Sequence, residues 1–170
     1  MGTESIRRAL EGAVGYLTAN PQEARYRDSH ARATLRDGLV VDVTGAAGEV
    51  LVTDMTTSVG GTASAPSPGW LFRASAASCV ATLIAMRAAS LEVTLGSLEV
   101  TVDSESDDRG ILGIDQAVPA GPLSVRVAVA IQASGIDAER LREIASWGIE
   151  HCPVTDAVGR QVPLETLIEV

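Results

Sequence analysis

The stretch that decides the fold is APSPGWLFRASAASCVATLIAMRAA, residues 65–89. Ser67 and Pro68 form a helix-start signal, because a hydroxyl can accept a free backbone N–H and the proline ring already has a helical φ. In the rest of the stretch the only charged residues are Arg73 and Arg87. A helix that is apolar all round is usually buried all round, and charged residues are costly within a membrane. The sequence therefore predicts a central helix, buried on all sides, in the core of a water-soluble protein.

Length and composition indicate a single globular core. The chain has 170 residues, of which 46% are hydrophobic and 21% charged, which is enough for one full core and short for two. All 13 cations are arginine and the net charge is −9, which disfavours nucleic acid and anionic membranes as partners. No sustained apolar run follows the first residues, so we expect no secretory signal and a cytoplasmic protein with reduced thiols.

Hydrophobic periodicity predicts a mixed α+β fold. Alternating apolar residues at Leu123, Val125 and Val127 indicate a strand with one wetter face, as in an antiparallel sheet. Along the chain we expect a helix at 4–19, strands at 39–43 and 49–54, the central helix, strands at 98–103 and 123–131, a helix from Asp137, and a last strand at about 162–170. Strands, helix, strands, helix and strand in this order make an α+β domain.

The chain has two cysteines, Cys79 in the central helix and Cys152 at the end of the helix that starts at Asp137. Cys152 follows Ile144 by eight residues and so falls on the apolar stripe of its helix, and Pro153 then prevents ordinary continuation of that helix. Both thiols therefore face the core, and one shared pocket is geometrically open to them. The alternative is an inert structural role for each, because free cysteine is among the most buried residue types.

Other kinds of site find little support in the sequence. The two histidines, His30 and His151, have no ligand spacing with the cysteines, so we expect no metal site. There is no phosphate-binding loop and no dinucleotide fingerprint, and we expect no bound cofactor. The acidic cluster at 103–108 lacks the spacing and the closing glutamate of a calcium loop, and we expect a solvated turn there.

Several of these features together resemble the OsmC/Ohr family. They are Gly60-Gly61, Ala65-Pro66-Ser67-Pro68 and Ala76-Ala77-Ser78-Cys79 around the first cysteine, the turn Asp108-Arg109-Gly110, and Cys152-Pro153-Val154 around the second. The resemblance covers residues 23–170 in the right order and leaves residues 1–22 as an N-terminal helical extension. It implies an α+β fold in which two bent antiparallel-type sheets surround two central helices, in an intertwined homodimer.

The resemblance also implies a thiol peroxidase that reduces small organic hydroperoxides. By this similarity, Cys79 attacks the peroxide as a thiolate, becomes a sulfenic acid and forms a disulfide with Cys152 as the resolving thiol. An external dithiol reductant, lipoyl-type in some members, then reopens the disulfide. Cys79 lies about three turns into its helix, too far from the end for the helix dipole to lower its pKa, so an arginine must do so.

Two departures from the family pattern leave alternatives open. The family carries that arginine in a glycine-rich turn, and the best match here is Arg36, which lacks the preceding glycines; an ordinary hairpin arginine is the alternative. Members of the hydroperoxide-resistance branch have a glutamate where this chain has Gly69. Arg73 shares the helix face of that position and either fills the vacated space or lies on the surface. The sequence therefore also admits a non-catalytic dimer that binds an apolar ligand or partner, and, as a third option, a thiol acyl or disulfide carrier.

Overall fold

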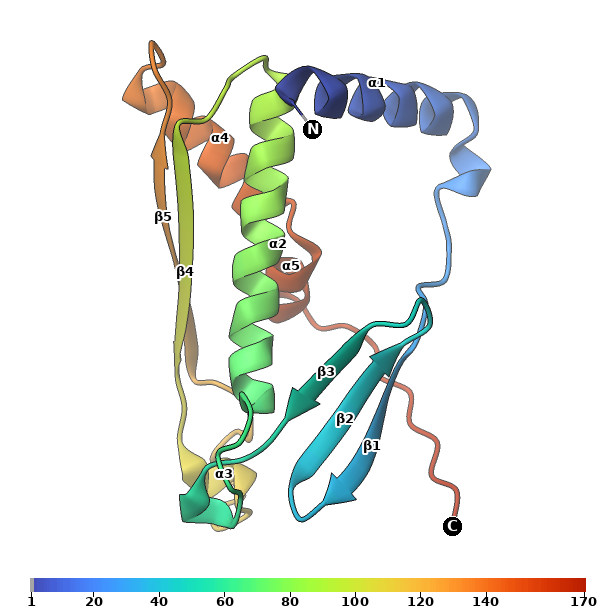
Figure 1. Cartoon of the computed structure of the whole chain (residues 1–170), viewed down its shortest axis with the longest axis vertical. Helices are drawn as coiled ribbons and strands as arrows, with labels where there is room; N and C mark the ends of the chain where they lie inside the picture. Colours follow the sequence, from blue (N-terminus) through green and yellow to red (C-terminus); the bar gives the residue numbers. More distant parts are fainter. Residues whose placement is uncertain (1) are drawn as a thin grey trace. The chain divides into compact units, whose positions relative to one another are not determined.

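Two antiparallel sheets, one before and one after the long helix α2 (Pro68–Ser90), make up the sheet content of the chain (Figure 1). The structure is a computed structural model that describes residues 2–170. These residues fall into a smaller unit of residues 12–74 and a larger unit of residues 2–11 and 75–170, each with its own sheet. Helix α2 begins in the smaller unit and ends in the larger one, and its bounds confirm the predicted central helix.

The smaller unit contains a three-stranded antiparallel sheet in the order β1-β2-β3. Its elements are β1 (Ala31–Asp37), β2 (Val40–Gly45), β3 (Val50–Thr53) and two single-turn 3-10 helices, η1 (Pro21–Glu23) and η2 (Thr57–Val59). Gly38 and Gly48 in the two hairpin turns have φ values of 53° and 94°, a left-handed conformation that glycine adopts without steric cost. The strands predicted on either side of the second turn are confirmed.

The larger unit contains a two-stranded antiparallel sheet and several helices. Its elements after α2 are β4 (Ser97–Glu105), α3 (Asp108–Ile111), β5 (Ser124–Gln132), α4 (Ala138–Glu150) and α5 (Pro153–Gly159). The strands β4 and β5 pair along their whole length, and the alternating pattern gives their sheet one apolar face. Asp137 caps α4 by accepting the N–H of Arg140 at 2.8 Å. The predicted class, mixed α+β with antiparallel sheets, is confirmed.

The core of the larger unit is formed by its sheet, α4 and the second part of α2. Val80, Ile84 and Ala88 of α2 are buried in one cluster with Ile144 of α4 and the apolar face of both strands. Gly148 lets the two helices approach closely, because a β-carbon at this position would lie 2.8 Å from the backbone nitrogen of Ile84. This close contact places the C-terminal end of α4 against the middle of α2.

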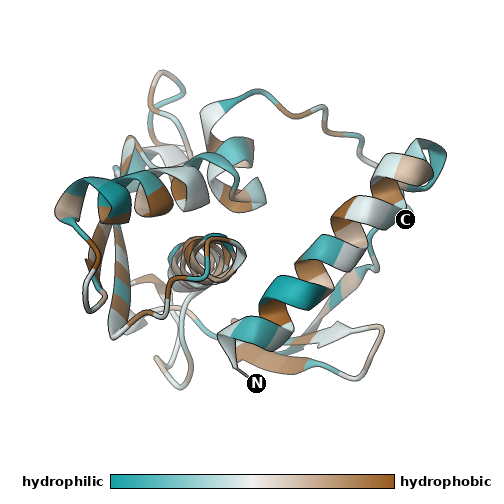
Figure 2. Ribbon diagram, turned by 90° about the horizontal axis from the view of Figure 1, so that it is seen from above, coloured by the Kyte–Doolittle hydropathy of each residue, from teal (hydrophilic) through white to brown (hydrophobic). Residues whose placement is uncertain are grey.

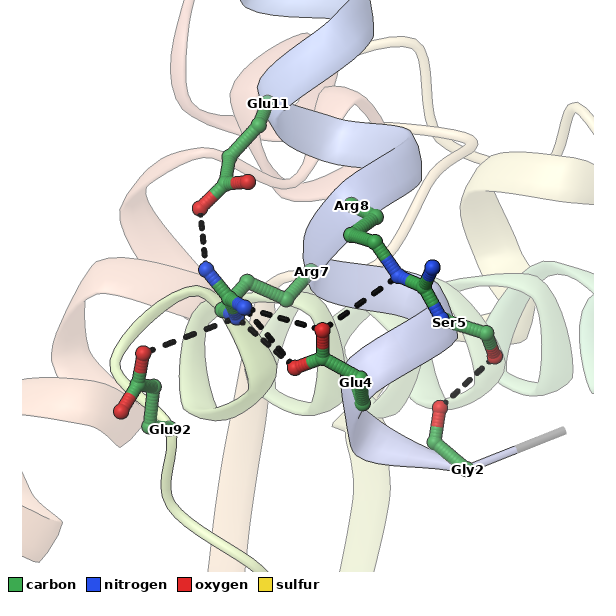
Figure 3. Close-up of polar contacts among 7 residues, drawn as sticks. All are labelled: Gly2, Glu4, Ser5, Arg7, Arg8, Glu11 and Glu92. Carbon is green, nitrogen blue, oxygen red and sulfur yellow. Dashed lines mark hydrogen bonds and ion pairs between the residues drawn. The ribbon is translucent and has the colours of Figure 1, made fainter.

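Helix α1 (Thr3–Ala19) confirms the predicted N-terminal helix, and none of its residues is buried. Hydrophilic and hydrophobic bands alternate along it (Figure 2). Within the larger unit, Arg7 pairs with Glu4 at 2.8 Å and Glu11 at 2.6 Å in the same helix, and with Glu92, which follows α2, at 3.6 Å (Figure 3). Exposed ion pairs contribute little to stability. We therefore expect this cluster to fix the orientation of the first turns of α1 and to add little to the stability of the protein.

Two sequence predictions about burial and the last strand are wrong. Helix α2 is buried along one face only, around Val80 and Ile84, because this is the face that meets the sheet and α4 in the larger unit. Residues 161–170 form no strand, because no neighbouring strand pairs with their backbone groups. Among residues 2–170, α2 is the one helix long and apolar enough to cross a membrane, a test that core helices of water-soluble proteins also pass.

Candidate functional site

The two cysteines predicted to share a pocket lie together in the larger unit. Cys79 is on α2, next to the buried Val80, and is partly exposed. Cys152 lies between α4 and α5 and is completely buried in the hydrophobic cluster on which Cys79 packs. Both are free thiols. A solvent-accessible thiol, Cys79, therefore lies beside a buried one, Cys152.

The two thiols lie close enough for each to influence the pKa of the other. Burial raises the pKa of Cys79, and the neighbouring Cys152 raises it further, against a smaller opposing effect of the Val154 N–H. Burial also acts to raise the pKa of Cys152. Thr155, through its N–H and its side chain, together with Cys79 and the N–H of Val154, outweighs burial and holds that pKa below its ordinary value.

The residues after Cys152 explain why backbone N–H groups lower its pKa. Pro153 has a fixed φ and no N–H, so α4 ends before it and the new helix α5 begins at it. Cys152 directly precedes the first turn of α5, where backbone N–H groups have no partner inside the helix. The Thr155 hydroxyl donates to the carbonyl of Ile149 at 2.7 Å and lies 3.0 Å from the carbonyl of Cys152, so it ties α5 to the end of α4.

An aromatic and charged cluster lies along the last turns of α4. The rings of Trp147 and His151 stack with their centroids 4.0 Å apart and their planes 12° from parallel. The guanidinium of Arg87 lies over the indole of Trp147 at 5.1 Å and pairs with Glu143 at 3.4 Å. Because Arg87 belongs to α2, its contacts with Trp147 and Glu143 join α2 to α4 at a second place besides Gly148.

Arg36, predicted to support the thiolate, lies in the smaller unit on β1. Its Nε donates to Asp42 of β2 at 2.9 Å, and its Nη2 forms a second, short contact with the same carboxylate. This hydrogen-bonded pair raises the pKa of Arg36 and lowers that of Asp42. A role for Arg36 toward Cys79 stays a prediction, and within its own unit the guanidinium is engaged by Asp42.

The start of α2 lines a pocket of about 390 Å³ in the smaller unit. Trp70 and Arg73 of α2 contribute to its wall, as does the loop after β3. A β-carbon at Gly69 would lie 3.8 Å from Nη1 of Arg73. Of the two alternatives for Arg73, the structure thus favours the one in which its guanidinium lies beside position 69.

Asp54 is a buried carboxylate in the loop before α2 that the sequence pattern does not single out. It accepts hydrogen bonds from the N–H groups of Met55, Thr62 and Ser64 at 2.7 to 3.0 Å, and from the hydroxyls of Thr62 and Ser64. The bonds from Thr62 and Ser64 hold the pKa of Asp54 far below its ordinary value. An acidic residue ahead of a run of threonine, serine and glycine is a signal for such a loop.

Helix α5 and Thr155 are also absent from the sequence prediction. The pattern indicates Pro153 as the end of one helix, whereas the same proline is at the first position of the next. Proline is common at that first position, so the signal was available in the sequence. Among residues 2–170, no group of three or more histidine, cysteine, aspartate or glutamate side chains is placed to hold a metal ion.

Comparison with known proteins identifies the family. The model of the family described as OsmC-like protein matches residues 61–167, which include both cysteines. A search of curated proteins finds no match. Among solved structures, the chain is similar to an organic hydroperoxide resistance protein OsmC from Legionella pneumophila, with a TM-score of 0.56 and 21% identity over 79% of this chain and 90% of that one.

Two further structures share the fold. An organic hydroperoxide resistance protein from Elizabethkingia anophelis has a TM-score of 0.59 and 18% identity, with 79% of this chain and 89% of that one covered. An OsmC-like protein from Mycoplasma pneumoniae has a TM-score of 0.67 and 12% identity, with the same coverage. Identities this low show the fold alone, but the family model spans more than half of the chain. The chain therefore belongs to the OsmC-like family.

Proposed function

We propose that the protein is a cysteine-based peroxidase that reduces organic hydroperoxides at the expense of a dithiol. The observation that carries the proposal is the pair of free thiols at one hydrophobic cluster, with Cys79 partly exposed and Cys152 buried. Membership of the OsmC-like family supports it, as does the similarity in fold to proteins named for organic hydroperoxide resistance.

The thiol pair can perform the whole reduction. The Cys79 thiolate attacks one oxygen of the hydroperoxide, so that an S–O bond forms, the O–O bond breaks and the alkoxide leaves to take up a proton as the alcohol. Cys79 is now a sulfenic acid. The sulfur of Cys152 displaces its hydroxyl group, which leaves as water, and a Cys79–Cys152 disulfide remains. An external dithiol, lipoyl-type in this proposal, restores both thiols by two exchange steps and becomes a disulfide itself.

We further propose a homodimer as the functional unit. The tail residues Leu164, Leu167 and Ile168 are 83–87% exposed, and Val14 is exposed on α1, a helix without buried residues. Apolar surface of this kind is typical of an interaction site.

The proposal locates the reaction in the cytoplasm, where thiols are kept reduced.

Rapid mixing with two peroxides tests the proposed activity. We expect cumene hydroperoxide to oxidise the reduced wild type much faster than it oxidises a free thiol, and faster than hydrogen peroxide does. Cys79→Ser is the matched control and should abolish the fast phase, because it replaces the reacting sulfur with a hydroxyl of nearly the same size. Rates equal to those of a free thiol for both peroxides would contradict the proposal.

A non-catalytic dimer that binds an apolar ligand is the second candidate. The observations that favour it are the absence of a carboxylate at Gly69 and the pocket beside Trp70, whose side chain is half exposed. Binding of an environment-sensitive apolar dye, weakened by Trp70→Ala, together with free-thiol rates for both peroxides, would select this candidate. A fast reaction at Cys79 excludes it.

A further inference from the structure

The pocket in the smaller unit has the size and the walls of a site for a small molecule. Its volume of about 390 Å³ lies within the range of about 300–1,000 Å³ that is usual for ligand pockets. More than half of the side chains that line it are apolar, namely Met55, Ala63, Ala65, Pro66 and Trp70. Trp70 is half exposed, so a ligand in the pocket covers apolar surface that water now covers. The walls therefore favour a ligand with an apolar body.

Arg73 is the one cation among the pocket residues that the structure describes. It follows Trp70 by three positions on α2, which makes the two side chains neighbours on one face of the helix. Its Nη1 lies 3.8 Å from the place that a β-carbon would take at Gly69, and glycine has no side chain to cover the guanidinium there. A guanidinium presents five N–H donors in a planar fork that matches a carboxylate. Arg73 can therefore bind a carboxylate in addition to its interaction within the chain.

Asp54, the other charged residue of the wall, already has its hydrogen-bond donors. Its buried carboxylate accepts the N–H groups of Met55, Thr62 and Ser64 and the hydroxyls of Thr62 and Ser64. These donors all belong to its own loop and balance its charge locally. A fixed negative charge in the wall nevertheless disfavours a second anionic group in a ligand. The pocket thus suits one carboxylate better than two.

We propose that this pocket binds a small monocarboxylic acid with an apolar body, whose carboxylate pairs with Arg73 and whose body packs on Trp70. At the ~30 Å³ that a water molecule occupies in the liquid, the pocket holds a ligand of about 13 non-hydrogen atoms. The proposal does not depend on the proposed peroxidase function, because neither cysteine takes part in it.

The first test uses the wild-type protein and two probes of the same shape. 2-Naphthoate has about the size of the pocket and carries one carboxylate, which 2-naphthamide replaces with a neutral amide. Calorimetric titration should give a Kd of about 1 mM or tighter for 2-naphthoate. Binding of 2-naphthamide, and of the dicarboxylate of naphthalene, should be weaker, the amide by about tenfold or more. Because the net charge of −9 repels anions in general, a preference for the monocarboxylate must come from a local cation.

The two tryptophans of the chain locate the bound probe. Trp70 lines the pocket, whereas Trp147 belongs to the larger unit. In NMR spectra, 2-naphthoate should shift the indole N–H signal of Trp70 and leave that of Trp147 unchanged, which makes Trp147 an internal control. Trp70→Ala identifies the first signal and should weaken binding about tenfold, which is the upper range for an aromatic contact.

Substitutions at two positions test the pairing with Arg73. Arg73→Gln should weaken the binding of 2-naphthoate about tenfold or more and leave that of 2-naphthamide unchanged. Arg126→Gln is the matched control, because it removes the same charge from an exposed site on β5. Gly69→Glu adds a carboxylate four residues before Arg73, where it can pair with the guanidinium on the same helix face. It should compete with 2-naphthoate, whereas the uncharged Gly69→Gln should not.

The outcomes decide the proposal without reference to the peroxidase. Equal affinity of the wild type for 2-naphthoate and 2-naphthamide would overturn the recognition of a carboxylate. No saturable binding far above 1 mM, or a shift at Trp147 in place of Trp70, would overturn the site. Unchanged binding of 2-naphthoate in Arg73→Gln would overturn the role of Arg73. Cys79→Ser should bind 2-naphthoate like the wild type while it loses the reaction with peroxide, so the failure of one proposal is distinguishable from the failure of the other.

Discussion

Replacing Gly148 with alanine tests the helix contact that brings the two cysteines together. The new β-carbon would lie 2.8 Å from the backbone nitrogen of Ile84 and 3.1 Å from its Cα, well inside ordinary van der Waals contact. Backbone atoms cannot rotate away, so α4 must shift from α2. Overpacking of this kind costs about 1–3 kcal/mol, while replacing a helical glycine with alanine gains up to about 1 kcal/mol. With the full gain, the net loss is up to about 2 kcal/mol.

Two assays check this prediction, with a matched control in the same chain. Urea denaturation followed by circular dichroism measures the free energy of unfolding, and the rate of Cys79–Cys152 disulfide formation after peroxide measures the alignment of the thiols. A displacement near 1 Å can slow a reaction up to about 100-fold. Gly15→Ala in α1, where nothing lies within 4 Å of the new carbon, should leave both measurements unchanged or slightly raise the stability. A Gly148→Ala protein as stable and as fast as wild type would refute the packing of α4 on α2.

Three further predictions concern stability. Ile84→Ala removes a fully buried side chain from the cluster and should lower the free energy of unfolding by about 2–5 kcal/mol in urea denaturation; a loss below 1 kcal/mol, on the order of an exposed site, would contradict the core. Gly110→Ala sets a β-carbon 2.9 Å from the Val118 carbonyl oxygen and should cost about 1–3 kcal/mol by the same assay. Because the pKa of Asp54 is lowered by folding, its stabilisation is full above the unfolded pKa near 3.9 and is lost as pH falls below it. Asp54→Asn should therefore be less stable than the wild type at neutral pH and should lose less stability on acidification. If thermal melts show that the two proteins lose the same stability as the pH falls, the hydrogen bonds assigned to the Asp54 carboxylate are contradicted.

Periodicity made the regular elements predictable from sequence. The alternation along β4 and β5 and the start signals at Ser67 and Asp137 are local features, and the structure confirms the elements that they predict. The proximity of Cys79 and Cys152 could also be anticipated, since each lies on the inward stripe of its helix. The sequence pattern of the two helices and the burial of their apolar stripes both bring the two cysteines together.

The remaining features depend on relations that a local pattern does not contain. The tail at 161–170 has the alternation of a strand, but a strand needs a neighbour for its hydrogen bonds, and the chain supplies none there. The carboxylate of Asp54 finds its donors eight and ten residues later, through the fold of a loop. The lowered pKa of Cys152 depends on where the N–H groups of Thr155 and Val154 point after the chain turns at Pro153.

The most direct test of the account is to map the disulfide as it forms. Reduced wild-type protein is mixed with one equivalent of cumene hydroperoxide, quenched over time, alkylated and digested without reductant for mass spectrometry. The account predicts a peptide pair linked through Cys79 and Cys152, preceded by a sulfenic acid on Cys79, and complete long before a free thiol would react. Oxidation confined to the free-thiol rate, or a sulfenic acid that never yields the Cys79–Cys152 link, would contradict it.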